Sequence, residues 1–260
     1  MCELLKVSRS NYYTYQEKIK KEDPITKHIK RIFRDNNNSY GTRRIQVELR
    51  KEGYIASRRR IGRIMREKGL VSVYTVAQYR VYPEAHNTQD IKNELDRSFD
   101  NKKKLEAIVS DLTYVRVGGK WNYICTILDL FNREIIGYSA GPNKDANLIL
   151  KAFSSIKGNL NDIGLFHTDR GKEFINKEIE RLLSEFGIKR SLSNPGVPYD
   201  NSVAESNFKS LKFEFVYQNQ FENLEELKRK LGGHIWWYNN KRLHSSLGYK
   251  TPIEYKMIHS

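Results

Sequence analysis

The chain has 260 residues, of which 38% are hydrophobic and 30% are charged, as in a soluble protein with one or two packed domains. No apolar run approaches the roughly 18 residues of a membrane span, and the N-terminus lacks the apolar core of a signal peptide, so we expect a cytoplasmic protein without a membrane partner. Cys2, Cys125 and the six histidines show no paired ligand spacing, which argues against a zinc finger.

Positive charge is concentrated in the N-terminal part of the chain. The formal net charge is +15; residues 1–80 hold 20 basic and 8 acidic side chains, whereas the rest hold 26 and 23. Because neutralisation of phosphates dominates protein affinity for nucleic acids, a concentrated basic region is typical of a DNA or RNA binder. We therefore expect a nucleic-acid partner for the N-terminal region.

The basic region has the pattern of a small all-α domain over residues 23–80, after an N-terminal helical extension at 1–22. Its apolar residues recur at helical spacing in three stretches: Ile25, Ile29, Ile32 and Phe33; Ile45 and Leu49; Ile61, Ile64 and Met65. The last two stretches are joined through Gly53, and two short helices with a glycine-containing turn are typical of a helix-turn-helix.

The third stretch is rich in arginine. Arg58, Arg59, Arg60 and Arg63 lie on it, and on a recognition helix they would contact phosphates or guanine edges. A solvated basic helix face gives the same pattern. The sequence leaves both interpretations open.

Residues 81–104 have charge but no apolar period and are interpreted as a linker. The β-branched and aromatic segments that follow are joined by Gly118-Gly119, a pair suited to a tight hairpin turn. Over residues 105–260 the pattern predicts these elements: strands at 106–117, 120–131 and 133–140, a helix from about 145, a strand at 163–167, a second helix, a strand at 188–192 and a helix from about 202. Three antiparallel strands followed by alternating helix and strand predict a mixed five-stranded α/β sheet of the ribonuclease H-like class.

Three acidic residues stand where this fold would bring them together. Asp111 lies in the middle of an apolar strand, where an unpaired charge is costly, and Asp169 lies just past another strand. Glu205 lies in the first turn of the helix that would pack across both strands; 57 residues separate the first pair and 35 the second. Clustered carboxylates repel one another unless cations bind among them, and Mg²⁺ or Mn²⁺ prefers such oxygen ligands. The sequence therefore predicts that all three are catalytic ligands of two such ions, an arrangement suited to phosphoryl transfer.

Glu205 has a second interpretation. With Ser202 it has the S-x-x-E spacing of a capping box, in which each side chain satisfies a free backbone amide at the start of a helix. A cap of this kind could exist in the metal-free protein.

Several segments resemble one known family. "VSDLTYV", "LFHTDRGKEF", "PYDNSVAESNFKSLKFE" and "YNNKRLHSSLGYKTPIEY" are similar to the catalytic core of bacterial insertion-sequence transposases of the IS-three type, downstream-frame product, within the retroviral integrase superfamily. "YGTRRIQVELRKEGYIASRRRIGRIMREKGL" resembles the helix-turn-helix of the same family, so the resemblance covers nearly the whole chain.

The resemblance implies that Asp111, Asp169 and Glu205 are the D, D and E metal ligands of a DNA transposase. It also implies that Lys212 steadies DNA beside them, and two helical turns place Lys212 on the same face as Glu205. Its implied partners are the terminal inverted repeats of an element, target DNA, further copies of the same chain and an upstream-frame helix-turn-helix protein.

Other residues are assigned structural roles. Asp129 is the main rival as a metal ligand, but a hydrogen-bonded role near the sheet end is preferred. His167 is expected to be structurally satisfied, and Asp200 to shape the loop before the last helix of the core. The run Trp236 to Tyr238 fits either base stacking or core packing.

Three functions remain open on the residues alone. A transposase would cut next to the 3′ end of an element and join the freed 3′-hydroxyl to another phosphodiester. A ribonuclease H-like nuclease would cut without joining strands, and a sequence-specific regulator would bind DNA without metal-dependent chemistry. The basic helix-turn-helix before the core favours the transposase.

Overall fold

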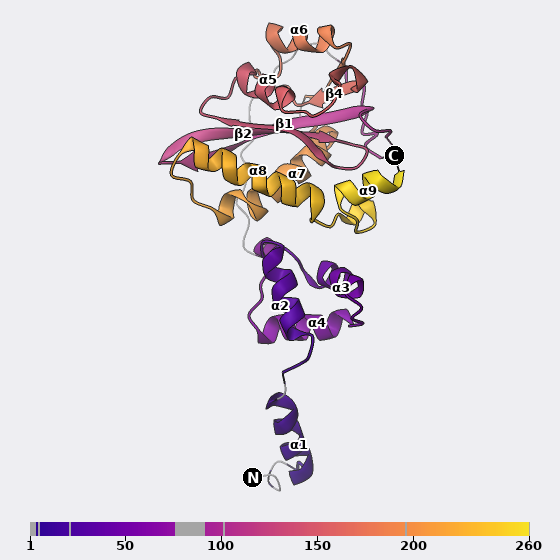
Figure 1. Ribbon diagram of the computed structural model, residues 1–260, viewed down its shortest axis with the longest axis vertical. Coiled ribbons are helices and arrows are strands. Elements are labelled where there is room, and N and C mark those ends of the chain that lie inside the picture. The colour runs from indigo at the N-terminus through magenta and orange to yellow at the C-terminus, as the bar shows by residue number, and fades with distance from the viewer. Residues whose placement is uncertain are drawn as a thin grey trace. The chain divides into compact units, whose positions relative to one another are not determined.

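The computed structural model describes residues 4, 6–20, 22–75, 92–100, 102–195 and 197–259 (Figure 1). The chain forms two compact units, Met1–Val76 and Ala77–Ser260, called here the N-terminal and C-terminal units. The first part of the predicted linker, at 81–91, lies outside the described residues. No helix in the described part of the chain is long and apolar enough to cross a membrane.

The N-terminal unit is helical, as predicted. Its helices are α1 (Arg9–Lys20), α2 (Thr26–Asp35), α3 (Thr42–Lys51) and α4 (Arg58–Glu67). The apolar residues of α2, α3 and α4 are buried together, among them Ile29, Ile45, Leu49, Ile61 and Ile64. The turn from α3 to α4 passes through Gly53 at φ 84°, a backbone conformation that glycine adopts without strain. Ser57 caps α4 by accepting a hydrogen bond from the Arg60 amide.

The C-terminal unit is built on one mixed sheet. Its strands are β1 (Ala107–Val117), β2 (Lys120–Asp129), β3 (Ile135–Gly141), β4 (Leu165–Thr168) and β5 (Lys189–Leu192), in the order β3-β2-β1-β4-β5. β1, β2 and β3 are antiparallel neighbours, whereas β4 runs parallel to β1 and β5 parallel to β4. The predicted mixed five-stranded sheet, with three antiparallel strands followed by two parallel ones, is confirmed.

The hairpin between β1 and β2 confirms the role of its two glycines. Gly118 and Gly119 have φ values of 52° and 80°, and Val117 pairs with Lys120 across them. Two successive positive φ angles give a two-residue turn whose twist matches that of the strands.

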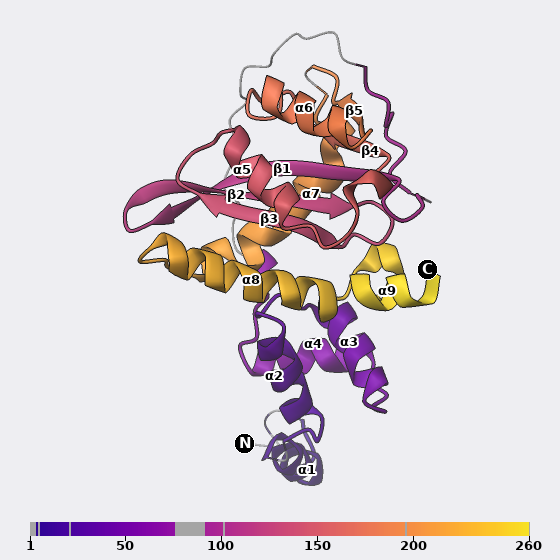
Figure 2. The same cartoon turned by 45° about the horizontal axis from the view of Figure 1, so that its top comes forward.

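Helices cover both faces of the sheet (Figures 1 and 2). α5 (Ala146–Ser154) and α6 (Lys177–Glu185) lie on one face; α7 (Ser202–Glu214) and α8 (Leu224–Asn240) lie on the other, followed by α9 (Pro252–His259). Because alternate residues of a strand point to opposite faces, β1 contributes to both cores. Ile108 packs with the α5 and α6 side chains, and Val109 and Val115 pack with those of α7 and α8.

A buried ion pair fixes the end of α7 to the segment after α8. Arg242 Nε donates to Glu214 Oε2 at 2.7 Å, and both side chains are buried. Arg242 Nη2 also donates to Ser210 Oγ at 3.0 Å. The guanidinium is thus held by two residues of the helix that carries Glu205 and Lys212.

Candidate active site

The register of the sheet places Asp111 and Asp169 at matching positions. β1 and β4 pair in parallel, with Val109 opposite His167. Asp111 lies two residues after Val109, and Asp169 lies two residues after His167. The period of a strand is two residues, so Asp111 is on the face of Val109, and Asp169 directly follows the last residue of β4. Neighbouring strands lie about 4.8 Å apart, so this register places the two aspartates close together at adjacent strands in the middle of the sheet.

α7 lies over the same part of β1 and carries Glu205 in its first turn. Thr126, the cross-strand partner of Asp111, donates from Oγ1 to Asn207 Oδ1 at 3.3 Å. Asn207 is only two residues from Glu205 along the helix. The start of α7 is therefore fixed beside Asp111, and Figure 2 shows this helix running across the sheet.

A buried cluster positions the loop that leads into α7. The Asp200 side chain is 1% exposed, and its carboxylate accepts hydrogen bonds from Asn93 Nδ2, Arg97 Nε and Asn194 Nδ2 at 2.9, 2.7 and 2.9 Å. His167 Nε2 donates to the Asp200 carbonyl at 2.9 Å, and burial lowers the pKa of His167 to about 4, so the ring is neutral. The structural roles predicted for Asp200 and His167 are confirmed.

The start of α7 differs from the capping-box interpretation. A 3-10 turn at Pro198–Asn201 leads directly into the helix, so Ser202 is its first residue and Asn201 takes the cap position without a side-chain cap bond. Glu205 is consequently one position too far into the helix for the S-x-x-E exchange. The Glu205 side chain is exposed, so its carboxylate is available for another role.

The three acids interact electrostatically. Loss of water contact, followed by the negative charge of Asp169, raises the pKa of Asp111 to about 8. Although the Glu205 side chain is exposed at the surface, nearby protein atoms displace part of its hydrating water, and this desolvation, followed by the Asp169 charge, raises its pKa. Asp169 therefore lies within electrostatic reach of both other carboxylates, as a shared site requires.

Among the residues that the structure describes, no three His, Cys, Asp or Glu side chains are gathered closely enough to form a finished metal site. Asp111 Oδ1 accepts from the Leu112 amide at 2.7 Å, and Asp169 Oδ1 accepts from the Gly171 amide at 3.0 Å. The donor set consists of carboxylate oxygens, the ligands that Mg²⁺ and Mn²⁺ prefer, and in its chemistry it fits a divalent cation.

Lys212 supplies the positive charge of this region. Its charge lowers the pKa of Asp111, opposing the effects of burial and Asp169, and its Nζ lies 5.3 Å from the centre of the Tyr114 ring. The lysine predicted beside the carboxylates is therefore close to one of them.

Asp129 is at the end of β2, opposite Ile108 in the register of β1 with β2, and Ile108 lies three residues before Asp111. Its carboxylate is buried and accepts from the Leu105 amide at 3.1 Å and the Phe131 amide at 3.0 Å. This confirms the hydrogen-bonded role that the sequence favoured over metal binding.

The pKa of Asp111 leads to a prediction about stability. An acid whose pKa is higher in the folded than in the unfolded protein makes the protein less stable as the pH rises between the two values. In EDTA, the stability advantage of Asp111→Asn over the wild-type protein should therefore grow from about pH 4 to about pH 8, because asparagine cannot ionise. Thermal unfolding of both proteins at several pH values measures this difference.

Comparing the two proteins cancels the titration of groups that both contain. Mg²⁺ at pH 8 should narrow or reverse the difference, because the ion stabilises the ionised site of the wild-type protein alone. A difference that stays constant with pH would show that Asp111 has an ordinary pKa.

The arginines predicted to contact DNA divide into two groups. Arg58, Arg59 and Arg63 are exposed on α4, whereas Arg60 is partly buried. Arg60 Nε and Nη2 donate to both carboxylate oxygens of Asp23 at 2.9 and 2.7 Å, and Arg63 Nη2 approaches the same carboxylate at 3.4 Å. Arg60 thus helps to hold α4 in place, while Arg58 and Arg59 remain at the surface.

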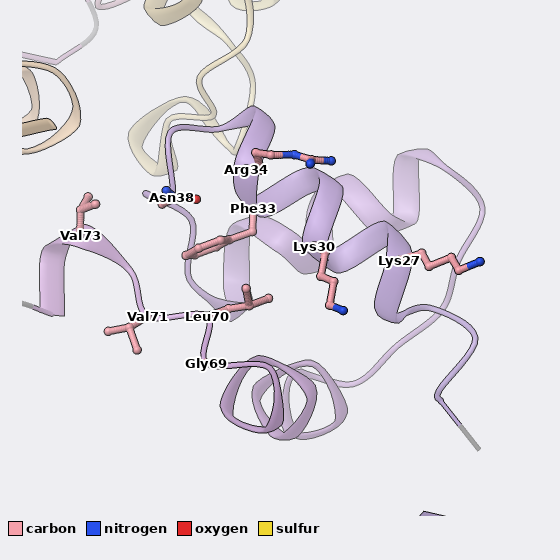
Figure 3. Close-up of a pocket in the computed structure, with 9 residues that line it drawn as sticks. All are labelled: Lys27, Lys30, Phe33, Arg34, Asn38, Gly69, Leu70, Val71 and Val73. Atoms are coloured by element: carbon pink, nitrogen blue, oxygen red, sulfur yellow. The ribbon is translucent and has the colours of Figure 1, made fainter. Parts of the chain in front are cut away.

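A hollow in the N-terminal unit has a basic side that the sequence analysis missed (Figure 3). Lys27, Lys30 and Arg34 line it from α2, and Phe33 and Leu70 form part of its apolar side. The three basic residues are spaced by three and four positions, which places them along one face of a helix. That spacing was the available signal for a second basic surface.

The chain was compared with known protein families and known proteins. The HTH-like domain family matches residues 20–78, and two integrase core domain families match residues 101–198 and 186–252. The chain is 33% identical over 257 residues to the putative transposase InsK for insertion sequence element IS150 of Escherichia coli strain K12, covering 96% of this chain and 90% of that protein. It is 28% identical over 239 residues to the transposase for insertion sequence element IS904 of Lactococcus lactis subsp. lactis strain IL1403, covering 91% and 94%.

A solved structure shares the fold. A chain of the simian T-cell lymphotropic virus intasome, solved in complex with PP2A regulatory subunit B56 gamma, superposes with a TM-score of 0.50 at 14% identity, covering 80% of this chain and 69% of that one. At this identity the likeness concerns the fold alone. The similarity to InsK along nearly all of both chains, together with the order of the matched domains, shows that this chain belongs to the insertion-sequence transposases of the IS-three type.

Proposed function

We propose that this protein is a DNA transposase that cuts next to the 3′ end of an insertion sequence and transfers the freed 3′-hydroxyl to a second phosphodiester. The observation that supports the proposal is the electrostatic interaction of Asp169 with both Asp111 and Glu205. Asp111 and Asp169 each lie two residues after one member of the β1–β4 pair Val109 and His167. The negative charge of Asp169 raises the pKa of both Asp111 and Glu205. Family membership gives this cluster its chemical context.

The three carboxylates would hold two Mg²⁺ or Mn²⁺ ions. Bound there, divalent ions supply activation of the attacking oxygen and stabilisation of the leaving oxygen in an in-line displacement. Asp111 is fixed by the centre of the sheet, whereas Glu205 is exposed on the first turn of α7, whose positive end favours its ionised form. The protein thereby combines one rigid ligand with one that is free to adjust.

Positively charged side chains would hold the DNA. Lys212 lies close enough to Asp111 to lower its pKa, and there its ammonium group would neutralise a phosphate next to the scissile bond. On α4, the exposed Arg58 and Arg59 are better placed for contacts with phosphates or bases than Arg60, which is paired with Asp23. These contacts would determine binding, not the chemical step.

The same proposal covers the partners. Element ends and target DNA are the substrates of this chemistry, and joining two ends requires at least two DNA-bound sites. We therefore expect several copies of the chain to act together on DNA. An upstream-frame helix-turn-helix protein would add recognition of the element ends.

Incubating the full chain with labelled element ends and Mg²⁺, with and without the upstream-frame protein, tests this function. A transposase joins strands covalently, so its product strands are longer than either substrate strand. Metal-dependent fragments without joints would favour the nuclease, and DNA retention without any metal-dependent product would favour the regulator. Either of these two outcomes would overturn the proposal.

A further inference from the structure

Two aromatic side chains of the β1–β2 hairpin are exposed beside the carboxylate cluster. Tyr114 is 49% exposed and Trp121 is 51% exposed, and their ring centres are 5.1 Å apart in an edge-to-face arrangement. Among the contacting ring pairs in the described part of the C-terminal unit, Tyr114 with Trp121 is the pair in which both rings are about half exposed. Exposed paired aromatic rings leave apolar surface uncovered, which a binding partner would bury.

Cations accompany both rings. The Arg116 guanidinium carbon lies 4.9 Å from the centre of the Trp121 ring, and Lys212 Nζ lies 5.3 Å from that of Tyr114. The sequence between Asp111 and Asp129 contains no acidic residue, so the hairpin itself is positively charged. Aromatic rings interleaved with cations are typical of surfaces that bind single-stranded nucleic acids.

The hairpin lies within reach of the cutting site. Tyr114 is three residues beyond Asp111 on β1, about 10 Å along the strand, a distance that a few nucleotides of one DNA strand can span. Tyr114 and Asp111 point to opposite faces of β1. However, β4 pairs with β1 only through Val109, so the part of β1 that carries both residues has no β4 partner. Lys212 links the two, because its charge acts on Asp111 and its ammonium lies by the Tyr114 ring.

The hairpin is also held firmly. The Gly118 amide donates to the Phe221 carbonyl at 2.9 Å, and a Cβ at Gly118 would lie 2.8 Å from the Glu222 carbonyl oxygen. Only glycine permits this approach at φ 52°. A rigid support is what a binding surface needs in order to position its ligand.

We propose that Tyr114 and Trp121 bind unpaired nucleotides flanking the scissile phosphate, with the bases contacting the rings and the phosphates contacting Arg116 and Lys212. The proposal rests on the proposed function, since it takes the DNA strand to pass the three carboxylates. Unpaired bases fit better than duplex DNA, whose base faces are stacked on one another and so cannot reach the rings. The hairpin would thus hold the frayed end of a cut or invading strand.

Binding without cleavage tests this proposal. We would measure the affinity of the full chain, in EDTA, for a duplex end with a three-nucleotide unpaired flank and for the same end fully paired. Trp121→Ala should weaken binding of the flanked end by roughly 5- to 100-fold, the range expected for loss of one base–aromatic stack, and Trp121→Phe should retain most of the affinity. Fluorescence of a 2-aminopurine in the flank should be quenched by the wild-type protein and quenched less by Trp121→Ala, in which Tyr114 remains.

Trp236→Ala is the matched control, because the Trp236 ring is 58% exposed on α8. This substitution should leave the affinity for the flanked end and for the fully paired end unchanged. Equal affinities of wild type and Trp121→Ala for the flanked end would overturn the proposal. So would equal losses on flanked and fully paired ends, since these would indicate general DNA contact in place of stacking. Strand joining is measured separately, so a protein that stacks bases without joining strands would contradict the proposed function alone.

Discussion

Asp111→Asn, Asp169→Asn and Glu205→Gln should each lower the rate of strand joining by roughly 1,000-fold or more. Metal ions contribute several kcal/mol to stabilisation of the transition state in such reactions, and about 1.36 kcal/mol corresponds to a factor of ten in rate. Each substitution removes one charged ligand and nearly preserves side-chain shape. The rate of joint formation on labelled element ends, at saturating protein and Mg²⁺, measures the effect.

Asp162→Asn is the control for these variants, because Asp162 is an exposed acid of the same unit at the end of a 3-10 turn. It should join strands at the wild-type rate. DNA affinity and thermal unfolding of all four variants establish that they remain folded and bind their substrate. Joining at near wild-type rates by any of the three ligand variants would remove that residue from the active site.

Glu214→Ala should destabilise the C-terminal unit by about 3–5 kcal/mol, since it leaves the buried Arg242 guanidinium without its carboxylate partner. The loss should exceed that from most single substitutions. Urea unfolding, followed by a signal from the C-terminal unit, measures it.

The exposed pair of Lys228 with Glu225 provides the comparison. Glu225→Ala removes an ion pair of the same 2.7 Å length at the surface of α8 and should cost less than about 1 kcal/mol. Similar losses in the two variants would show that the burial of Glu214 does not determine its contribution.

The features that the sequence predicted well are those set by local pattern. The Gly118-Gly119 pair determines the hairpin and therefore the register of β1 with β2. An acid within an apolar strand needs a partner, which makes Asp111 a candidate from the sequence alone, and the parallel pairing of β1 with β4 places Asp169 at the end of the adjacent strand. Glu205 is a candidate only through its spacing and its family motif, because local chemistry alone assigns it to a cap.

The features that the sequence did not determine depend on contacts between distant residues. Arg60 was grouped with the DNA-contacting arginines because its partner, Asp23, lies 37 positions earlier in the chain. In the aromatic run, Trp237 and Tyr238 are buried, as core packing predicts, whereas Trp236 is exposed.

The capping interpretation failed for a local reason. Pro198 lies in a 3-10 turn that runs directly into α7 and shifts the helix start to Ser202. A one-residue shift is enough to separate the two members of a capping box. Sequence patterns rarely define a helix boundary to that accuracy.

The central claim is that Asp111, Asp169 and Glu205 share divalent cations, and anomalous scattering from Mn²⁺ in crystals of the full chain with an uncleavable element end tests it most directly. We expect two Mn²⁺ positions bound by oxygens of these three residues, and loss of at least one position in Asp111→Asn crystals. Mn²⁺ bound elsewhere, or no Mn²⁺ between Asp111 and Asp169 while DNA occupies the site, would contradict it.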